Sequence, residues 1–377
     1  MLVRVLIASI FIAGAPLSQA AAKEQAPCGV PETAANDWQI ESQITEGIDQ
    51  QLLCALIDKL NSVNANIHSI LIIRGGRLVF EHYRAGADQK WGIALGKVVH
   101  GPAVKHDVRS VSKSIVSLLI GIALDHKLIA SIEEPVFKYF PEYATLRTPA
   151  KDRILPRHLL TMSSGIAWDE KRPYTDPENG ERRMIDSPDP YRFVLEQPLG
   201  AEPGQLWNYS GGSPALLGAI LQKVTGKSLV AFARESLFEP LGITDFEWLK
   251  MPYGEIAAAS GLRMRSRDMA KIGQLLLSRG EWQGKRIVSA KWLEESLKPR
   301  FLAEPPYYYG YQWWIGSSLL GTRKVDWFEA YGLGSQRIIV VPSLDSVVVF
   351  TTGLYFEENP GTTELLDNFI LPAIVRQ

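Results

Sequence analysis

The sequence predicts an α/β (α+β) fold in which an antiparallel sheet is flanked by helices and interrupted by an all-helical domain. Two alternating apolar segments, 68–74 and 77–83, surround a two-residue glycine turn, which predicts a β-hairpin. The middle of the chain carries helical periodicity and long loops, and alternating segments return near the C-terminus. We therefore expect the N-terminal hairpin to join the C-terminal strands, which gives a sheet domain from residues 21–125 and 255–377 around a helical domain from residues 126–254.

The first twenty residues predict a signal peptide. Arg4 supplies the positive charge, residues 5–13 the apolar stretch, and Ser18-Gln19-Ala20 a small-x-small cleavage site, with cleavage after Ala22 as a second possibility. The alternative is an uncleaved membrane anchor, which the short apolar stretch disfavours. We expect a periplasmic or secreted protein with no stable membrane insertion after signal cleavage.

The composition is that of an ordinary globular protein. The 377 residues are 46% hydrophobic and 21% charged, with a formal net charge of −1. This balance argues against nucleic acid or an anionic membrane as the main partner. Cys28 and Cys54 are the only cysteines, and in an oxidising compartment we expect them to form a disulfide. Two free buried thiols are the alternative.

The remaining elements are predicted from hydrophobic periodicity and from the residues that end helices and form turns. A polar loop is expected between residue 84 and a helix that begins at Ser110, and a long Pro-rich polar loop over 171–190 has the composition of a lid or binding loop. The other expected helices are 48–60, 156–164, 213–225, 229–237, 266–278, 289–297 and 363–375, and the other expected strands are 310–316, 325–331, 336–341 and 346–352.

The start of the 110–124 helix carries the main candidate for chemistry. In Ser110-Val111-Ser112-Lys113, the serine and the lysine lie three residues apart and therefore on one helix face. The apolar run that follows predicts a buried helix, and a lysine beside it is partly desolvated, which favours its basic form. Ser110 can then be an activated nucleophile. The alternative is that Ser110 only caps the helix and Lys113 is a surface charge.

Two further segments add candidate groups. Tyr209, in a turn rich in glycine, can relay protons if it lies near the lysine, although it can equally be a core tyrosine. The segment Ala330-Tyr331-Gly332-Leu333-Gly334-Ser335-Gln336 predicts a strand edge at which backbone N–H groups approach a substrate closely. The N–H groups of Leu333 and Ser110 would together form an oxyanion hole.

Taken together, these motifs resemble the serine β-lactamase and penicillin-binding-protein superfamily, nearest its class C-like branch. That branch includes type VIII carboxylesterases, D-amino-acid peptidases and 6-aminohexanoate-dimer hydrolases. The resemblance implies a β-lactamase/transpeptidase-like fold. It makes Ser110 and Lys113 the S-x-x-K pair, gives Tyr209 the acid/base role of the Y-x-N motif, and places Gly332 and Leu333 where K-T-G or H-x-G occurs.

Two positions depart from the pattern of that superfamily. Gly211 replaces the asparagine of Y-x-N, at a position that contacts substrate, and Ala330 replaces the lysine of K-T-G. Both changes remove groups that would hold a β-lactam or a peptide carboxylate. Arg323, Lys324 and Arg337 are close enough in sequence to supply the missing charge. The pattern around Ala330, together with the stretch Trp168-Asp169-Glu170 before the long loop, resembles the 6-aminohexanoate-dimer hydrolase and esterase side of the superfamily.

Other motifs carry less information. The segment Gly211-Gly212-Ser213-Pro214-Ala215 approaches a G-x-S-x-G elbow, but no strand precedes it, and we interpret it as a helix start. The histidines are scattered along the chain, with none paired at metal-ligand spacing. They are His68, His82, His100, His106, His126 and His158.

The expected function is an exported serine hydrolase that cleaves small esters or amides through an acyl-enzyme on Ser110. This chemistry needs no metal or cofactor. One alternative is a β-lactamase or a D,D- or D-amino-acid peptidase. An alternative of another class is a non-catalytic binding protein of the cell envelope, against which the complete set Ser110, Lys113 and Tyr209 argues.

Overall fold

The computed structural model describes residues 28–32, 37–43, 47–355 and 361–375. The expected signal peptide lies outside these residues. Among the described helices, none alone is long and apolar enough to cross a bilayer. The helical runs Gly212–Thr225 and Leu229–Leu241 meet that criterion only as a pair, with a bend of 80° between them.

The core of the fold is an eight-stranded sheet in the order β10-β11-β12-β13-β14-β15-β1-β2. Neighbouring strands are antiparallel throughout, and β1 pairs with β15 so that Ile70 faces Phe350. The N-terminal hairpin therefore joins the C-terminal strands, and the predicted fold class is confirmed. The strands are β1 (Ile67–Arg74), β2 (Arg77–Tyr83), β10 (Phe301–Glu304), β11 (Tyr307–Tyr309), β12 (Trp314–Leu320), β13 (Arg323–Gly332), β14 (Gln336–Val341) and β15 (Ser346–Thr352).

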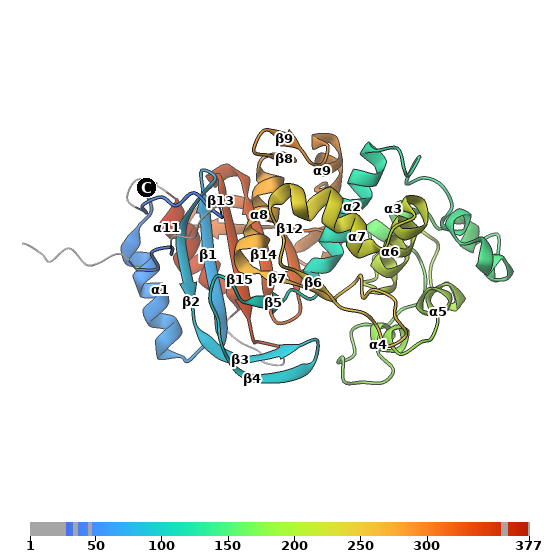
Figure 1. Ribbon diagram of the computed structural model, residues 1–377, viewed down its shortest axis with the longest axis horizontal. Coiled ribbons are helices and arrows are strands. Elements are labelled where there is room, and N and C mark those ends of the chain that lie inside the picture. The colour runs from blue at the N-terminus through green and yellow to red at the C-terminus, as the bar shows by residue number, and fades with distance from the viewer. Residues whose placement is uncertain (1–27, 33–36, 44–46, 356–360, 376–377) are drawn as a thin grey trace, which may run out of the picture.

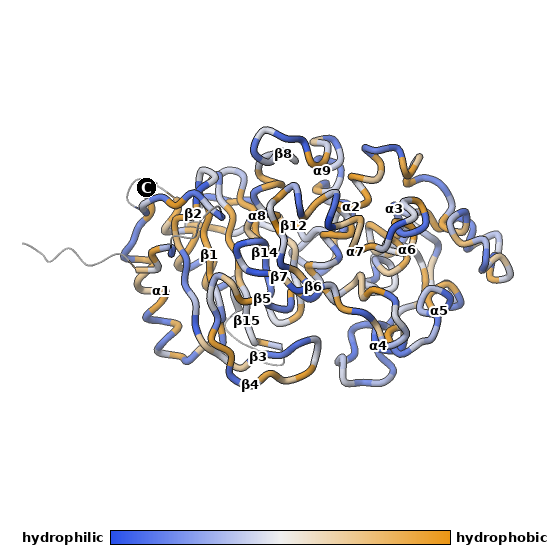
Figure 2. Tube along the Cα trace, in the orientation of Figure 1, coloured by the Kyte–Doolittle hydropathy of each residue, from blue (hydrophilic) through white to orange (hydrophobic). Residues whose placement is uncertain are grey.

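Helices cover both faces of this sheet (Figure 1). One face packs against α1 (Gln50–Ser62) and the C-terminal helical run, and the other against α2 (Val111–Asp125) and α8 (Ser266–Leu277). On β15, Val347 and Val349 belong to the core on the α2 and α8 face. Val348 and Phe350 belong to the core on the α1 face. Because side chains alternate along a strand, a strand covered on both faces is apolar at nearly every position. Orange, hydrophobic stretches accordingly run along β1 in Figure 2.

A helical region lies beside the sheet, on the right in Figure 1. Its central helix, α6, is buried from Gly212 to Leu221 and packs against α2. The division of the chain at residues 125 and 255 remains a prediction. The helices of this region are α3 (Pro156–Leu160), α4 (Gly180–Ile185), α5 (Pro190–Glu196), α6 (Gly212–Thr225) and α7 (Leu229–Ala233), with 3-10 turns at Val136–Tyr139, Pro141–Leu146, Lys151–Arg153 and Glu239–Leu241.

The remaining elements complete the sheet side of the molecule. The helix expected over 363–375 is a continuous run of three parts, with a π-helical turn in the middle. The predicted strand at 310–316 is displaced, because β12 begins only at Trp314. Further elements are α9 (Ala290–Ser296), α10 (Thr362–Leu365), η7 (Leu366–Ile370), α11 (Leu371–Ile374), β6 (Glu247–Trp248), β7 (Leu262–Arg265), β8 (Glu281–Trp282) and β9 (Lys285–Arg286).

The polar loop expected before Ser110 is wrong. That segment forms a hairpin of β3 (Ala85–Lys90) and β4 (Ile93–Val99), followed by β5 (Lys105–Asp107), which pairs with β7. Most of β4 is exposed. The strands β3 and β4 are therefore held mainly by pairing with each other, and their sequences show little alternation of apolar and polar residues. The loop expected over 171–190 likewise contains α4, which the Asn179 side chain caps by accepting from the Arg182 N–H. The disulfide between Cys28 and Cys54 is present, as predicted.

Candidate active site

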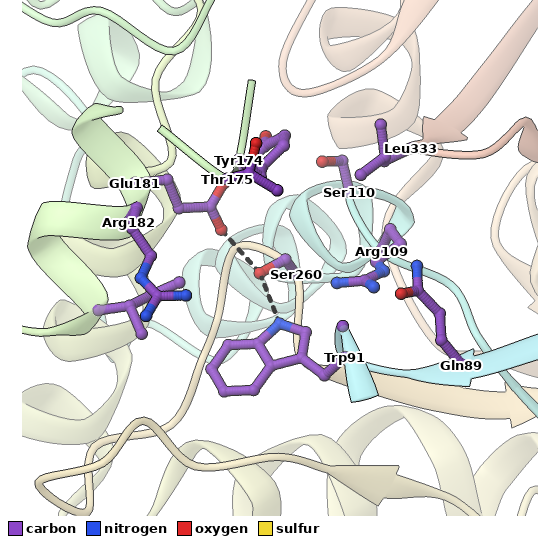
Figure 3. A pocket seen from close by; sticks show the side chains of 12 residues that line it. Gln89, Trp91, Arg109, Ser110, Tyr174, Thr175, Glu181, Arg182, Ser260 and Leu333 are labelled. Carbon is purple, nitrogen blue, oxygen red and sulfur yellow. Dashed lines mark hydrogen bonds between the residues drawn. The ribbon is translucent and has the colours of Figure 1, made fainter. Parts of the chain in front are cut away.

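A cavity of about 250 Å³ opens where the sheet side meets the helical region (Figure 3). Its wall combines the β3–β4 hairpin, the start of α2, the loop before α4, the segment before β7 and the turn after β13. The lining residues used below are Gln89, Trp91, Arg109, Ser110, Tyr174, Glu181, Arg182, Ser260 and Leu333.

Ser110 stands at the cavity end of α2. It occupies the N-cap position, but its side chain makes no capping hydrogen bond. Its Oγ instead accepts a hydrogen bond of 2.9 Å from Lys113 Nζ, which also donates to the carbonyl of Ala259 at 3.1 Å. Lys113 is 1% exposed. The readings of Ser110 as a mere cap and of Lys113 as a surface charge are therefore both wrong.

The backbone just before Ser110 is strained. Arg109 has φ +49°, in the left-handed region that non-glycine residues seldom occupy. Such strain is maintained where the surrounding structure demands it, and it is concentrated at functional sites. Here it turns the chain from β5 into α2 and presents the Ser110 hydroxyl to the cavity.

Tyr209 completes the group of three that the sequence predicts. Its side chain shares a hydrogen bond with Ser110, and its ring centroid lies 5.0 Å from Lys113 Nζ. Burial raises the pKa of the phenol well above its usual value, and the charge of Glu170 adds to this effect. Tyr209 is therefore a neutral hydroxyl that can donate as well as accept a proton.

The end of β13 packs directly against the backbone of the Ser110 turn. A Cβ atom on Gly332 would lie 2.3 Å from the carbonyl oxygen of Val108 and 3.1 Å from the Ser110 nitrogen. Only glycine permits so close an approach. The next residue, Leu333, lines the cavity beside Ser110, as Figure 3 shows. The structure thus brings the predicted Ser110, Lys113, Tyr209, Gly332 and Leu333 to one place.

Two carboxyl groups to which the sequence reasoning gave no role at the site lie behind these residues. Glu181, on α4, places a carboxylate oxygen 4.0 Å from Lys113 Nζ. Glu170 accepts hydrogen bonds from the Gly211 N–H at 2.6 Å and from the Trp168 indole at 2.8 Å. A Cβ atom on Gly211 would lie 2.9 Å from Cδ of Glu181. The signal was the glycine itself, since the absent side chain leaves the space that Glu181 fills.

Comparisons with known proteins identify the family of this chain. The profile of the Beta-lactamase family matches residues 65–367, which is most of the chain. The chain belongs to the Beta-lactamase family. It is 25% identical to the 6-aminohexanoate-dimer hydrolase of Paenarthrobacter ureafaciens over 303 residues, which cover 74% of this chain and 71% of that protein.

Solved structures of this family share the fold. A structure of a putative 6-aminohexanoate-dimer hydrolase from Bacillus anthracis superposes with a TM-score of 0.71 at 21% identity, over 89% of this chain and 87% of that one. A family VIII carboxylesterase superposes with a TM-score of 0.66 at 16% identity, over 88% of this chain and 98% of that one. As a member of the Beta-lactamase family, the protein is a hydrolase.

In this Beta-lactamase family member only one of the two buried carboxyl groups is ionised at neutral pH. Burial, followed by the negative charge of Glu181, raises the pKa of Glu170 to about 8. Burial opposes ionisation of Glu181 as well, but the Lys113 ammonium and hydrogen bonds from its neighbours outweigh it and lower the pKa of Glu181. At neutral pH Glu170 therefore holds a proton and Glu181 carries the negative charge.

A chain of hydrogen bonds fixes Glu181 in place. Its carboxylate accepts from the Ser260 hydroxyl at 2.7 Å, and the Trp91 indole donates to that hydroxyl at 3.3 Å (dashed lines in Figure 3). The Tyr174 hydroxyl contacts both acids, at 2.9 Å from Glu170 and 3.2 Å from Glu181. The loop before α4 and the β3–β4 hairpin are thereby both connected to the acid pair.

The cations near β13 do not supply the charge missing at Ala330. Arg337 is buried against Glu329, and Lys324 pairs with Asp326 at 2.8 Å. Neither they nor Arg323 line the cavity; its wall holds Arg109 and Arg182 instead. Ala330 itself is fully buried.

Each of the two cavity arginines has an acidic partner. Arg109 Nε lies 3.5 Å from Asp107 Oδ2, and Arg182 Nε lies 2.7 Å from Asp186 Oδ2. Their charges are therefore partly neutralised before any substrate arrives.

Two minor interpretations can also be compared with the structure. Gly211 is the N-cap of α6 and Ser213 is a buried residue of its first turn, as predicted. The view of the histidines as scattered is wrong in space, because the fold brings His68, His100 and His106 together.

Proposed function

We propose that this protein is an exported serine hydrolase that cleaves small, uncharged esters or amides through an acyl-enzyme on Ser110. The observation that carries the proposal is the hydrogen bond between the buried Lys113 and Ser110 at the edge of the cavity. A cavity of about 250 Å³ is at the small end of ligand pockets, which favours a small acyl or leaving group. Export rests on the N-terminal sequence alone.

In the proposed reaction, the Ser110 hydroxyl attacks the carbonyl carbon while its proton passes to Lys113. The backbone N–H groups of Ser110 and Leu333 hold the developing oxyanion. Tyr209 donates a proton to the leaving alkoxide or amine, and the ester bond between Ser110 and the acyl group remains. Water then attacks that ester and Tyr209 removes its proton. The acyl–serine bond breaks as Lys113 returns its proton to the Ser110 oxygen, and the free acid leaves.

The carboxylate of Glu181 supports Lys113 as a base in the proposed mechanism. Once Lys113 has taken the serine proton, the Glu181 carboxylate, 4.0 Å away, stabilises the positive charge. In the proposed mechanism Glu181 acts through Lys113 and is a positioning residue.

Relatives support both bond types. The curated relative is named a 6-aminohexanoate-dimer hydrolase, which is an amidase name, and one structural neighbour is a carboxylesterase. A β-lactamase or peptidase activity is the second candidate. Arg109 on the cavity wall is the observation that favours it, since an arginine can bind a substrate carboxylate; its pairing with Asp107 argues against it.

The test is a hydrolysis panel of p-nitrophenyl esters, linear amides and a chromogenic cephalosporin, with Ser110→Ala and Ser117→Ala in parallel. Ser117 is on the same helix and its hydroxyl has no hydrogen-bond partner, so it is the matched control. We expect ester or amide turnover in the wild type and Ser117→Ala and none in Ser110→Ala. Mass spectrometry should find the acyl group on the peptide containing Ser110. Undiminished turnover by folded Ser110→Ala would overturn the proposal.

A further inference from the structure

A second polar cluster lies next to the cavity, on its sheet side. It is formed by the end of β4, by β3 and β5 of the hairpin region, and by β1 of the main sheet. We name it the His–Asp cluster; its members are His68, Asp88, His100 and His106. All four are buried, and their ligand-type atoms lie within 4.8 Å of one another.

The two central imidazoles, those of His68 and His106, each present an acceptor nitrogen to the other, so neither can donate a hydrogen bond across the contact. His106 Nδ1 contacts the carbonyl oxygen of Asp107 at 2.8 Å, so it carries the hydrogen and Nε2 carries a lone pair. Nε2 of His68 contacts the side-chain oxygen of Asn66 at 3.0 Å, so Nδ1 of His68 also carries a lone pair. The Asn66 amide is oriented by its own donation to the carbonyl of Ala87.

The two nitrogen atoms that carry these lone pairs, His68 Nδ1 and His106 Nε2, are only 2.8 Å apart. Neutral acceptors at that distance repel, so a positive species between them is required. One proton would satisfy this contact, but it would leave the third imidazole unpaired. His100 Nε2 is buried without a hydrogen-bond partner, in a residue that is 8% exposed, and it points to the Asp88 carboxylate at 3.8 Å.

We propose that the His–Asp cluster binds one divalent transition-metal ion of the zinc class. Three imidazole nitrogens and one carboxylate oxygen are a ligand set that zinc prefers, in tetrahedral geometry. At the usual bond lengths, neighbouring ligand atoms of such a site are about 3.4 Å apart. The recorded separations lie around that value. They are 2.8 Å from His68 Nδ1 to His106 Nε2, 3.3 Å from His106 Nε2 to Asp88 Oδ1, and 3.8 Å from His100 Nε2 to the other oxygen, Asp88 Oδ2.

The surroundings match those of metal-binding histidines. Such residues donate their other ring N–H to a carbonyl or carboxylate, as His106 does to Asp107 O and His68 to Asn66. Asp88 is held in turn by the Gln89 N–H at 2.8 Å and by the Tyr355 hydroxyl at 3.4 Å. Burial lowers the pKa of His100 and of His106 to about 4, which keeps both in the neutral form that binds metal.

The site is structural and not catalytic. Four protein ligands close a tetrahedral shell and leave no position for substrate. The ion would pin the β3–β4 hairpin, whose outer strand is largely exposed, to β1 and β5. Gln89 and Trp91 of that hairpin line the cavity, so the bound ion would fix one wall of the candidate active site.

The test measures metal directly and is independent of the hydrolase proposal. The full mature chain, produced without a polyhistidine tag in zinc-supplemented medium, is analysed for metal after gel filtration. We expect about one zinc ion per chain in the wild type. Chelation should lower the melting temperature, and Zn²⁺ but not Mg²⁺ should restore it. Co²⁺ in the chelated protein should give the intense visible absorption of tetrahedral coordination.

Three variants locate the ion. His100→Gln and Asp88→Asn keep the shape of the cluster and should abolish both the zinc content and the rise in melting temperature on adding Zn²⁺. His126→Gln, which removes an exposed histidine at the end of α2, should retain both. A wild type that contains no zinc and does not respond to it overturns the proposal. So does a zinc ion that His100→Gln retains as fully as His126→Gln, because that ion binds elsewhere.

Discussion

The side chain of Glu181 fills the space that Gly211 leaves beside Lys113. A Cβ atom on Gly211 would lie 2.9 Å from Cδ of Glu181, so the two features require each other. Where the related Y-x-N motif has an amide after the tyrosine, this chain brings a carboxylate from another helix. The substitution replaces a neutral group with a charge beside the lysine, and it has consequences for rate and for pH dependence.

Glu181→Gln should lower kcat/KM by about tenfold or more, because the amide no longer stabilises the positive charge that Lys113 acquires. The control is Glu178→Gln, which alters an exposed residue just before the same helix and should leave the rate unchanged. Steady-state kinetics on the best ester of the panel decide the matter. Equal rates in the two variants would show that the carboxylate has no part in the reaction.

Lys113→Ala should cost about 10² to 10⁴ in kcat with the fold intact, the usual loss for a general base. The exposed Lys127, just beyond the other end of α2, provides the control Lys127→Ala. Circular dichroism and kcat are measured on both. A folded Lys113→Ala protein that turns over at the wild-type rate would remove Lys113 from the mechanism.

The free energy of unfolding should carry a signature of Glu170. Its pKa in the folded protein, about 8, exceeds the ordinary value of 4.5. The folded state therefore keeps a proton that the unfolded state loses, and this contribution is complete below pH 4.5 and lost as the pH rises through 8. Relative to Glu170→Gln, the wild type should lose stability on the order of 3–4 kcal/mol between pH 5 and 8. Denaturant titrations of both proteins provide the comparison, and parallel pH curves would be the contrary result.

Gly332→Ala should damage the site from behind. The new methyl group would meet the Val108 carbonyl at 2.3 Å, so the strand end must move away from Ser110. We expect a loss of about 1–3 kcal/mol in stability from overpacking, and about 10² in kcat from a displaced Leu333 N–H. Gly101→Ala, where a Cβ would meet nothing within 4 Å, is the control for a glycine replacement. Similar kcat values for the two variants would show that the end of β13 has no part in stabilising the oxyanion.

Substrate charge should matter in a defined direction. Without a free cation at Ala330, a carboxylate-bearing cephalosporin lacks a charge-assisted contact of about 1.5–3 kcal/mol. We expect a p-nitrophenyl butyrate-type ester to have the higher kcat/KM. Arg109→Gln and Arg182→Gln then test whether either wall arginine assists anionic substrates. A cephalosporin that outperforms the ester would reverse the assignment of substrate class.

Much of the fold could be predicted from local patterns. The strands β14 and β15 match their predicted bounds because both faces are buried, which makes their apolar runs continuous and sharply ended. Ser110, Lys113 and Tyr209 could be predicted because each sits in a short motif. The roles of Glu170 and Glu181 could not be predicted. Glu170 lies in the stretch Trp168-Asp169-Glu170, but both roles depend on a void at Gly211, 30 residues further along the chain from Glu181.

The clustering of the histidines could not be predicted from the sequence for a similar reason. His68 lies on β1, His106 on β5, and His100 directly after β4. The hairpin that contains β4 is largely exposed, so the sequence does not reveal its strands. Spacing along the chain carries no information about a cluster assembled across strands. The pairing of β3 with β4, and of β5 with β7, must be known first.

The pairing of β1 with β15 sets the order in which this protein can mature. The first strand finds its sheet neighbour only after residue 352 has been synthesised, and Gly332 reaches the Ser110 turn almost as late. A nascent chain thus carries its nucleophile for most of its synthesis without the strand that completes the oxyanion hole. Long-range closure of this kind is slow, and it leaves the apolar edge of β1 unpaired in the meantime. Hydrolytic competence should therefore arise in a single late step, and chains truncated before β15 should bind chaperones and show no turnover.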